Sequence, residues 1–96
     1  RTIVATPEGE AYINPTGNPG MATAGTGDIL SGFVAGFLSQ GLNAKESSLL
    51  GVYLHGMAGD IAAANFSQTA LIASDLLKTF PEAVKRIEDC KMRNRY

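Results

Sequence analysis

The sequence contains very little of the chemistry that builds disulfides and metal centres. Its 96 residues include one cysteine (Cys90), one histidine (His55) and no tryptophan. A single cysteine excludes a disulfide within the chain, and one cysteine with one histidine forms no cluster with zinc-ligand spacing. The lone cysteine fits a reducing compartment, and we expect a cytoplasmic protein.

A long apolar run is also missing. The best stretch, residues 49–66, is interrupted by His55 and Asp60, so no membrane-spanning helix is expected. The chain opens on Arg-Thr-Ile-Val, without the basic segment and apolar core of a secretory signal. At 45% hydrophobic and 18% charged residues, the composition is that of a globular protein without a membrane partner.

Net charge is only −1, but the basic residues gather late in the chain. Residues 78–96 hold six basic and three acidic side chains. Such a tail is compatible with a nucleic-acid patch or with the ordinary preference of Lys and Arg for helix C-termini. The small excess and the absence of interleaved aromatic residues favour the second interpretation, and no nucleic-acid partner is expected.

Two short β-branched segments begin the sequence. Residues 2–6 and 10–14 predict strands, and the Pro-Glu-Gly turn at 7–9 joins them into a hairpin. A two-stranded hairpin is not stable by itself in water. Because the chain also begins without methionine, we expect residues 1–96 to be the C-terminal portion of one larger domain whose N-terminal part is missing here.

An irregular loop and several helices are predicted next. Residues 15–28 carry two prolines and four glycines, which predicts a long loop, and loops of this length are usually either functional or disordered. An apolar stripe of helical period then runs from Leu30 to Leu38, and Gly41 is placed as a stop. A second helix is predicted over 43–65, a third over 70–79, and a fourth from Pro81. Small residues on the second helix predict the close approach of another backbone.

The segment Gly25-Thr26-Gly27-Asp28 is the strongest candidate for chemistry. Backbone N–H groups in the first turn of a helix lack internal partners, and the helix dipole adds positive potential there. Glycines allow a phosphate to approach these groups closely. A carboxylate at the same place repels phosphate, so its useful task is to take a proton from an incoming hydroxyl. The residues alone leave a second interpretation open, in which Asp28 is an ordinary N-cap.

Three stretches together resemble the NAD(P)H-hydrate dehydratase family of the ribokinase-like superfamily. They are residues 18–32 (NPGMATAGTGDILSG), 51–60 (GVYLHGMAGD) and 73–77 (ASDLL). The resemblance implies an α/β fold: the C-terminal part of a ribokinase-like α/β/α domain, with a β-hairpin followed mainly by helices. It covers the chain from the hairpin to about residue 84.

The resemblance also implies a reaction. Members of this family repair hydrated NADH or NADPH with ADP or ATP, by phosphoryl transfer to the ring hydroxyl and elimination of phosphate. Asp28 matches the aspartate that binds the hydrated substrate and acts as base. Gly25, Thr26 and Gly27 match the phosphate-binding loop, with Gly27 touching the nucleotide. Mg²⁺ and a homo-oligomeric full-length protein are further implications.

Two more residues, Thr2 and Asn18, complete the predicted site. The family has a Lys-Gly-x-x-Thr segment that grips the nucleotide, and Thr2 matches its threonine; the lysine and glycine lie upstream of Arg1. By itself this piece is therefore expected to be inactive. Asn18 either binds the substrate or braces its own turn.

The remaining polar residues are interpreted mainly as structural. His55 is expected to be a hydrogen-bonded structural histidine, with a ligand contact as the alternative, and Asp60 a hydrogen-bond partner. Two other functions stay open: a sugar or vitamin-precursor kinase of the same superfamily, and a non-catalytic nucleotide-binding remnant.

Overall fold

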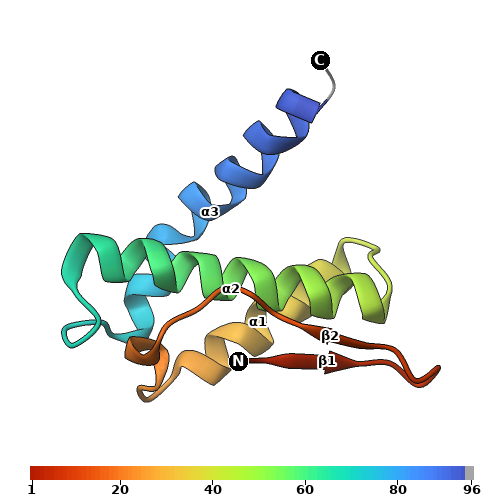
Figure 1. Ribbon diagram of the computed structural model, residues 1–96, viewed down its shortest axis with the longest axis horizontal. Coiled ribbons are helices and arrows are strands. Elements are labelled where there is room, and N and C mark those ends of the chain that lie inside the picture. Colours follow the sequence, from red (N-terminus) through yellow and green to blue (C-terminus); the bar gives the residue numbers. More distant parts are fainter. Residues whose placement is uncertain (95–96) are drawn as a thin grey trace.

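The computed structural model describes the backbone of residues 1–94 and the side chains of residues 1–90. It consists of a two-stranded hairpin followed by three helices, with the central helix α2 (Ala44–Phe66) in contact with both α1 (Thr26–Ser39) and α3 (Ala73–Asn94). Figure 1 shows the hairpin lying along α2 and the C-terminal half of α3 projecting from the rest of the molecule. The predicted order of a hairpin and then helices is confirmed.

The hairpin pairs β1 (Ile3–Ala5) with β2 (Ala11–Ile13) in antiparallel register, with Val4 opposite Tyr12. Side chains alternate between faces along each strand. One face carries Val4 and Tyr12, which line a hollow together with Leu49 and Leu50 of α2. The opposite face carries exposed isoleucines at positions 3 and 13. The hairpin therefore rests on α2 by one face only.

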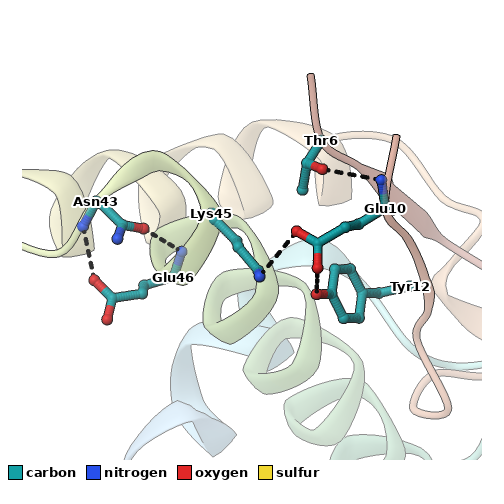
Figure 2. A network of polar contacts seen from close by, with 6 residues as sticks. All are labelled: Thr6, Glu10, Tyr12, Asn43, Lys45 and Glu46. Carbon is teal, nitrogen blue, oxygen red and sulfur yellow. Dashed lines mark hydrogen bonds and ion pairs between the residues drawn. The ribbon is translucent and has the colours of Figure 1, made fainter. Parts of the chain in front are cut away.

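A polar network fastens the hairpin to the start of α2 (Figure 2). Lys45 Nζ lies 3.1 Å from Glu10 Oε1 and 5.1 Å from the centre of the Tyr12 ring. The Tyr12 hydroxyl donates to Glu10 Oε2 at 2.8 Å. These two donors, Tyr12 before Lys45, hold the pKa of the Glu10 carboxyl below its usual value. The network joins residues that are 35 positions apart in the sequence.

Helix boundaries follow local sequence signals in the first two helices. Gly41 has φ of +98° just beyond α1, as predicted for a helix stop. Asn43 and Glu46 form a capping box at the start of α2: the Asn43 side chain accepts from the Glu46 N–H at 2.8 Å, and Glu46 Oε1 accepts from the Asn43 N–H at 3.0 Å. The predicted start of the second helix is confirmed.

The prediction of two separate helices over 70–79 and from Pro81 is wrong. A single helix, α3, begins at Ala73 and runs through Pro81. Asp75 in its first turn accepts from the Ile72 N–H at 3.0 Å, which sets the start three residues later than predicted. A proline inside a helix costs about 3 kcal/mol because one backbone hydrogen bond is lost. Buried residues on both sides, Leu76 and Ala83, share the same core, and their packing keeps the helix continuous.

The loop prediction also needs correction at both its middle and its end. A short 3-10 helix, η1 (Pro19–Met21), lies inside it, and α1 begins at Thr26. Asn18 caps η1, because its side chain accepts from the Gly20 N–H at 3.0 Å. Gly27 and Asp28 therefore belong to the first turn of a helix and not to the loop.

The core lies where α2 packs against α1 and α3. Its buried residues come from α2 and α3 and pack against one another: Leu54, Ala58, Ile61, Leu76 and Ala83. Phe33 of α1 stacks on Phe80 of α3 with ring centres 4.4 Å apart. Phe37 packs against the same cluster. The interpretation of Phe33 and Phe37 as core residues is confirmed.

Candidate functional site

The start of α1 presents polar groups that have no partner among the residues described by the structure. Gly25 precedes the helix with φ of +89°, a left-handed conformation that favours glycine, and no side chain caps the helix there. Asp28 is the third helical residue and is exposed. Its carboxylate has no hydrogen-bond or ion-pair partner among the residues that the structure describes. The interpretation of Asp28 as an N-cap is therefore wrong.

Two backbone N–H groups at this helix start have no acceptor among the residues that the structure describes. The Thr26 N–H reaches the Thr23 carbonyl at 3.5 Å and the Ile29 N–H reaches the Gly25 carbonyl at 3.2 Å. Between them, the N–H groups of Gly27 and Asp28 have no acceptor within the described part of the chain. A Cβ at Gly27 would meet no atom within 4 Å, so the space beside it is open. An anion can approach both N–H groups with the favourable helix dipole behind them.

The Thr26 side chain serves the loop itself. Its hydroxyl donates to the Met21 carbonyl at 2.9 Å and to the Thr23 carbonyl at 3.0 Å. A hydroxyl has a single hydrogen, which these two carbonyls share. Thr26 thus closes the turn that presents Gly27 and Asp28.

The side chain of Asp60 on α2 holds the glycine-rich loop by two hydrogen bonds. Its Oδ2 accepts from the Gly17 N–H, and its Oδ1 accepts from the Asn18 side-chain amide, each at 3.0 Å. The interpretation of Asp60 as a structural partner is confirmed. The Asn18 side chain braces the loop in two ways: its amide donates to Asp60, and its oxygen accepts from the Gly20 N–H. The expected contact between Asn18 and the substrate stays a prediction.

Backbone carbonyls of α2 hold the loop as well, and this was missed from the sequence. The Asn14 side-chain amide donates to the Val52 carbonyl at 3.2 Å, and the Thr16 hydroxyl donates to the Tyr53 carbonyl at 2.9 Å. Both donors flank Pro15 in a stretch rich in turn-forming residues, and this was the signal in the sequence that their side chains could hold a turn. Their acceptors lie 37 or more positions away, which no local pattern indicates.

Close approach depends on two glycines in α2. A Cβ on Gly56 would clash with the side chain and backbone of Thr16, and one on Gly59 would clash with the Met21 side chain. The predicted close approach of another backbone is confirmed at Gly56, whereas at Gly59 the close neighbour is a side chain.

His55 stands between the loop and α1. Its Nε2 lies 2.9 Å from the Thr26 carbonyl oxygen, and its ring meets Phe33 edge to face with centres 6.0 Å apart. Burial lowers the pKa of His55, although the hydrogen bond with the Thr26 carbonyl opposes that shift. His55 is therefore a hydrogen-bonded histidine, as expected, and it contacts Thr26 of the candidate phosphate loop.

A cleft of about 650 Å³ opens beside this loop. Of the predicted site residues, Thr2 and Asn18 line it, together with His55 and Gly56. The structure does not bring residues 25–28 into the wall of this cleft. The predicted site is thus divided into this polar cleft and the start of α1 at residues 25–28, which we call the helix mouth. His55 lines the cleft and also contacts the helix mouth through Thr26.

The described residues hold no cluster of three or more His, Cys, Asp or Glu side chains that suits a metal ion. Mg²⁺ binds proteins through carboxylates, waters and substrate phosphates, and Asp28 alone does not make such a site. These residues therefore do not fit a resident Mg²⁺ by themselves. No helix among residues 1–94 has the length and apolar character required to cross a membrane.

Comparison with known proteins relates this geometry to enzymes of nucleotide repair. The bifunctional NAD(P)H-hydrate repair enzyme of Moorella thermoacetica is 53% identical over 89 residues, which is 93% of this chain and 17% of that protein. The ADP-dependent (S)-NAD(P)H-hydrate dehydratase of Bacillus subtilis is 38% identical over 88 residues, covering 92% of this chain and 32% of the enzyme. The chain therefore spans a third or less of these relatives.

A solved structure agrees. The crystal structure of the Bacillus subtilis ADP/ATP-dependent NAD(P)H-hydrate dehydratase, co-crystallized with ATP/Mg²⁺, superimposes with a TM-score of 0.82 at 37% identity. The match covers 88% of this chain and 30% of that one. The family model for NAD(P)H-hydrate dehydratase matches residues 1–82, which include the hairpin, the loop and the first two helices. The chain belongs to the NAD(P)H-hydrate dehydratase family.

Proposed function

We propose that this chain is the C-terminal portion of one ribokinase-like domain that carries out ADP-dependent dehydration of (S)-NAD(P)H-hydrate to NAD(P)H. The observation that carries the proposal is the pair of N–H groups at Gly27 and Asp28, which, like the exposed Asp28 carboxylate beside them, have no partner among the described residues. The names of the related enzymes supply the reaction. The intact protein, and not residues 1–96 alone, is the proposed catalyst.

In this proposal the helix mouth holds phosphate oxygens. The Gly27 and Asp28 N–H groups donate to them, Gly25 provides the left-handed turn, and Thr26 fixes the turn through its hydroxyl. Negative charge that develops on the transferring phosphoryl group is stabilised by the same N–H groups and the helix dipole. Thr2 and Asn18 bind nucleotide and substrate from the adjoining cleft.

Asp28 is the proposed catalytic base. Its carboxylate accepts the proton of the ring hydroxyl of the hydrated nicotinamide while the oxygen of that hydroxyl attacks the terminal phosphoryl group of ADP and displaces AMP. Loss of phosphate from the phosphorylated ring, together with a proton from the neighbouring ring carbon, then restores the ring double bond. An exposed and unpaired carboxylate is suited to this task because no hydrogen bond within the described residues has to be broken before it accepts a proton.

The phosphoryl donor is ADP or ATP. The related enzymes are named as ADP-dependent, and one neighbouring structure was obtained with ATP/Mg²⁺. We further propose a cytoplasmic, homo-oligomeric enzyme that binds small molecules and no nucleic acid or membrane.

The decisive experiment is identification of the product. The intact protein is mixed with hydrated NADH and ADP, and regeneration of NADH is followed by its absorbance. Regenerated NADH supports the dehydratase. A stable phosphorylated alcohol instead identifies a small-molecule kinase of the same superfamily. Nucleotide binding without any product identifies a non-catalytic remnant, and a missing Lys-Gly pair upstream of Arg1 would agree with that outcome.

A further inference from the structure

His55 is the polar side chain of α2 that contacts the candidate phosphate loop of α1. Its Nε2 lies 2.9 Å from the carbonyl oxygen of Thr26, the first residue of that helix. A carbonyl oxygen only accepts hydrogen bonds, so Nε2 carries the hydrogen and donates it. Desolvation lowers the pKa of His55, which favours the neutral ring. In the neutral ring with a protonated Nε2, Nδ1 is left as an acceptor.

The Thr26 carbonyl shares a peptide unit with the N–H of Gly27. A trans peptide is planar, and its C=O and N–H groups point in opposite directions. A hydrogen bond that holds the Thr26 carbonyl toward His55 therefore turns the Gly27 N–H away from α2 and out of the helix mouth. This N–H group has no acceptor within the described residues. Hydrogen bonding at the carbonyl also polarises the peptide and strengthens its N–H as a donor.

The surroundings keep the imidazole in place. Phe33, which is buried, contacts the ring edge to face, and Phe33 is itself stacked on Phe80. His55 follows Leu54, a buried core residue, and precedes Gly56, which is in close contact with Thr16. The donor is therefore fixed by the packed interface between α1, α2 and α3.

We infer that His55 is a positioning residue: by donating to the Thr26 carbonyl it orients the Thr26–Gly27 peptide so that the Gly27 N–H binds a nucleotide phosphate. The inference rests on the proposed function, because it assigns His55 a task in that same site. It differs from a ligand contact, since Nε2 is already engaged by the protein. It also differs from core packing alone, since a donor at the Nε2 position is required.

The test compares two variants of the intact protein. His55→Phe keeps a ring against Phe33 but removes the donor, and His55→Gln replaces the donor with a side-chain amide of similar reach. ADP affinity is measured by calorimetry, kcat and KM with hydrated NADH, and Tm by thermal unfolding. We expect His55→Phe to weaken ADP binding about tenfold, the value of one hydrogen bond to a charged group. His55→Gln is expected to recover most of this loss.

Each outcome bears on the inference. Unchanged ADP affinity in His55→Phe overturns it, and so does an equal loss in both variants, which indicates packing. Weak binding in the Phe variant with recovery in the Gln variant supports it. Wild-type protein that binds ADP without regenerating NADH defeats the proposed dehydratase but leaves the comparison of affinities valid. Wild-type protein that binds no ADP overturns the inference, because there is then no phosphate for Gly27 to bind.

Discussion

Residues 14–18 and residues 27–28 lie within one continuous segment, yet their polar groups are used in opposite ways. Asn14, Thr16 and Asn18 each bond to α2 through their side chains, and the Gly17 N–H does so through Asp60. The N–H groups at positions 27 and 28 have no acceptor in the described part of the chain.

This difference separates the groups that hold the loop from those left for a ligand. Ordering a long glycine-rich loop costs conformational entropy. Hydrogen bonds to a rigid helix offset that cost before a ligand arrives, so less ordering remains to be done on binding. The unpaired groups then face the ligand in a fixed arrangement.

Removing the free carboxylate is expected to give the largest effect. Asp28→Asn in the intact protein should reduce turnover by about 10²- to 10⁴-fold, the usual contribution of a general base. ADP affinity should stay nearly unchanged, because the N–H groups that bind phosphate remain. Steady-state kinetics and calorimetry measure the two quantities. Full activity in this variant would exclude the base role.

The next largest effect is expected from a substitution that adds a side chain where the loop packs against α2. Gly56→Ala places a Cβ against the side chain and backbone of Thr16. We expect a loss of about 1–3 kcal/mol in the free energy of unfolding, as for other overpacked sites, together with weaker ADP binding. Urea unfolding of the intact protein provides the measurement.

Gly36→Ala is the matched control for this variant. A Cβ on Gly36 of α1 would meet no atom within 4 Å. Alanine is the better helix former by roughly 0.5–1 kcal/mol, so this variant should unfold at equal or higher urea concentration. Equal destabilisation by both substitutions would show that the Thr16 contact is not what matters at position 56.

Lowering the pH is expected to reduce stability by a smaller amount, through protonation of His55. Its pKa in the folded state lies below the ordinary 6.5. The unfolded state therefore binds the proton more readily as pH falls below about 6.5. The His55 contribution to stability is complete above that pH and is lost progressively as pH falls toward the lowered pKa. Thermal unfolding between about pH 7 and pH 5 should show this loss. It should be reduced in His55→Gln, and an identical pH profile would contradict the assignment.

The smallest effect is expected from the exposed network of Figure 2. Lys45→Ala removes the ion pair with Glu10 and the contact with the Tyr12 ring. Solvent screens such pairs, and many of them contribute little to stability. We expect Tm to change within a degree or so and ADP affinity to be unaltered. A marked loss of ADP binding would mean that the hairpin, and with it Thr2, is positioned by this network.

Local signals in the sequence were sufficient for much of the fold. The Pro-Glu-Gly turn predicted the hairpin, Gly41 predicted the end of α1, and the capping box at residues 43 and 46 predicted the start of α2. Each of these features is decided by residues within a few positions of one another. Pro81 gave the wrong prediction because tertiary packing on both sides of it outweighs the loss of one local hydrogen bond.

The site was predicted less completely. The placement of Gly25 and Asp28 at a helix start was predicted from local signals and is confirmed, whereas their roles toward phosphate and substrate stay predictions. The hydrogen bonds of Asn14, Thr16 and His55 join residues 29 to 38 positions apart, and their formation depends on how α1 and α2 pack. Small residues at positions 56 and 59 predicted that another segment packs closely against α2, but not that its contacts would be the Thr16 backbone and the Met21 side chain.

Two of the acceptors on α2 are main-chain carbonyls, those of Val52 and Tyr53, whereas Asp60 acts through its side chain and Gly56 through having none. A carbonyl is present whatever residue occupies the position. Positions 52 and 53 can therefore exchange side chains without changing their hydrogen bonds to the loop. Positions 56 and 60 lack this freedom. We therefore expect substitutions within this helix to accumulate at positions 52 and 53 and to be removed by selection at positions 56 and 60.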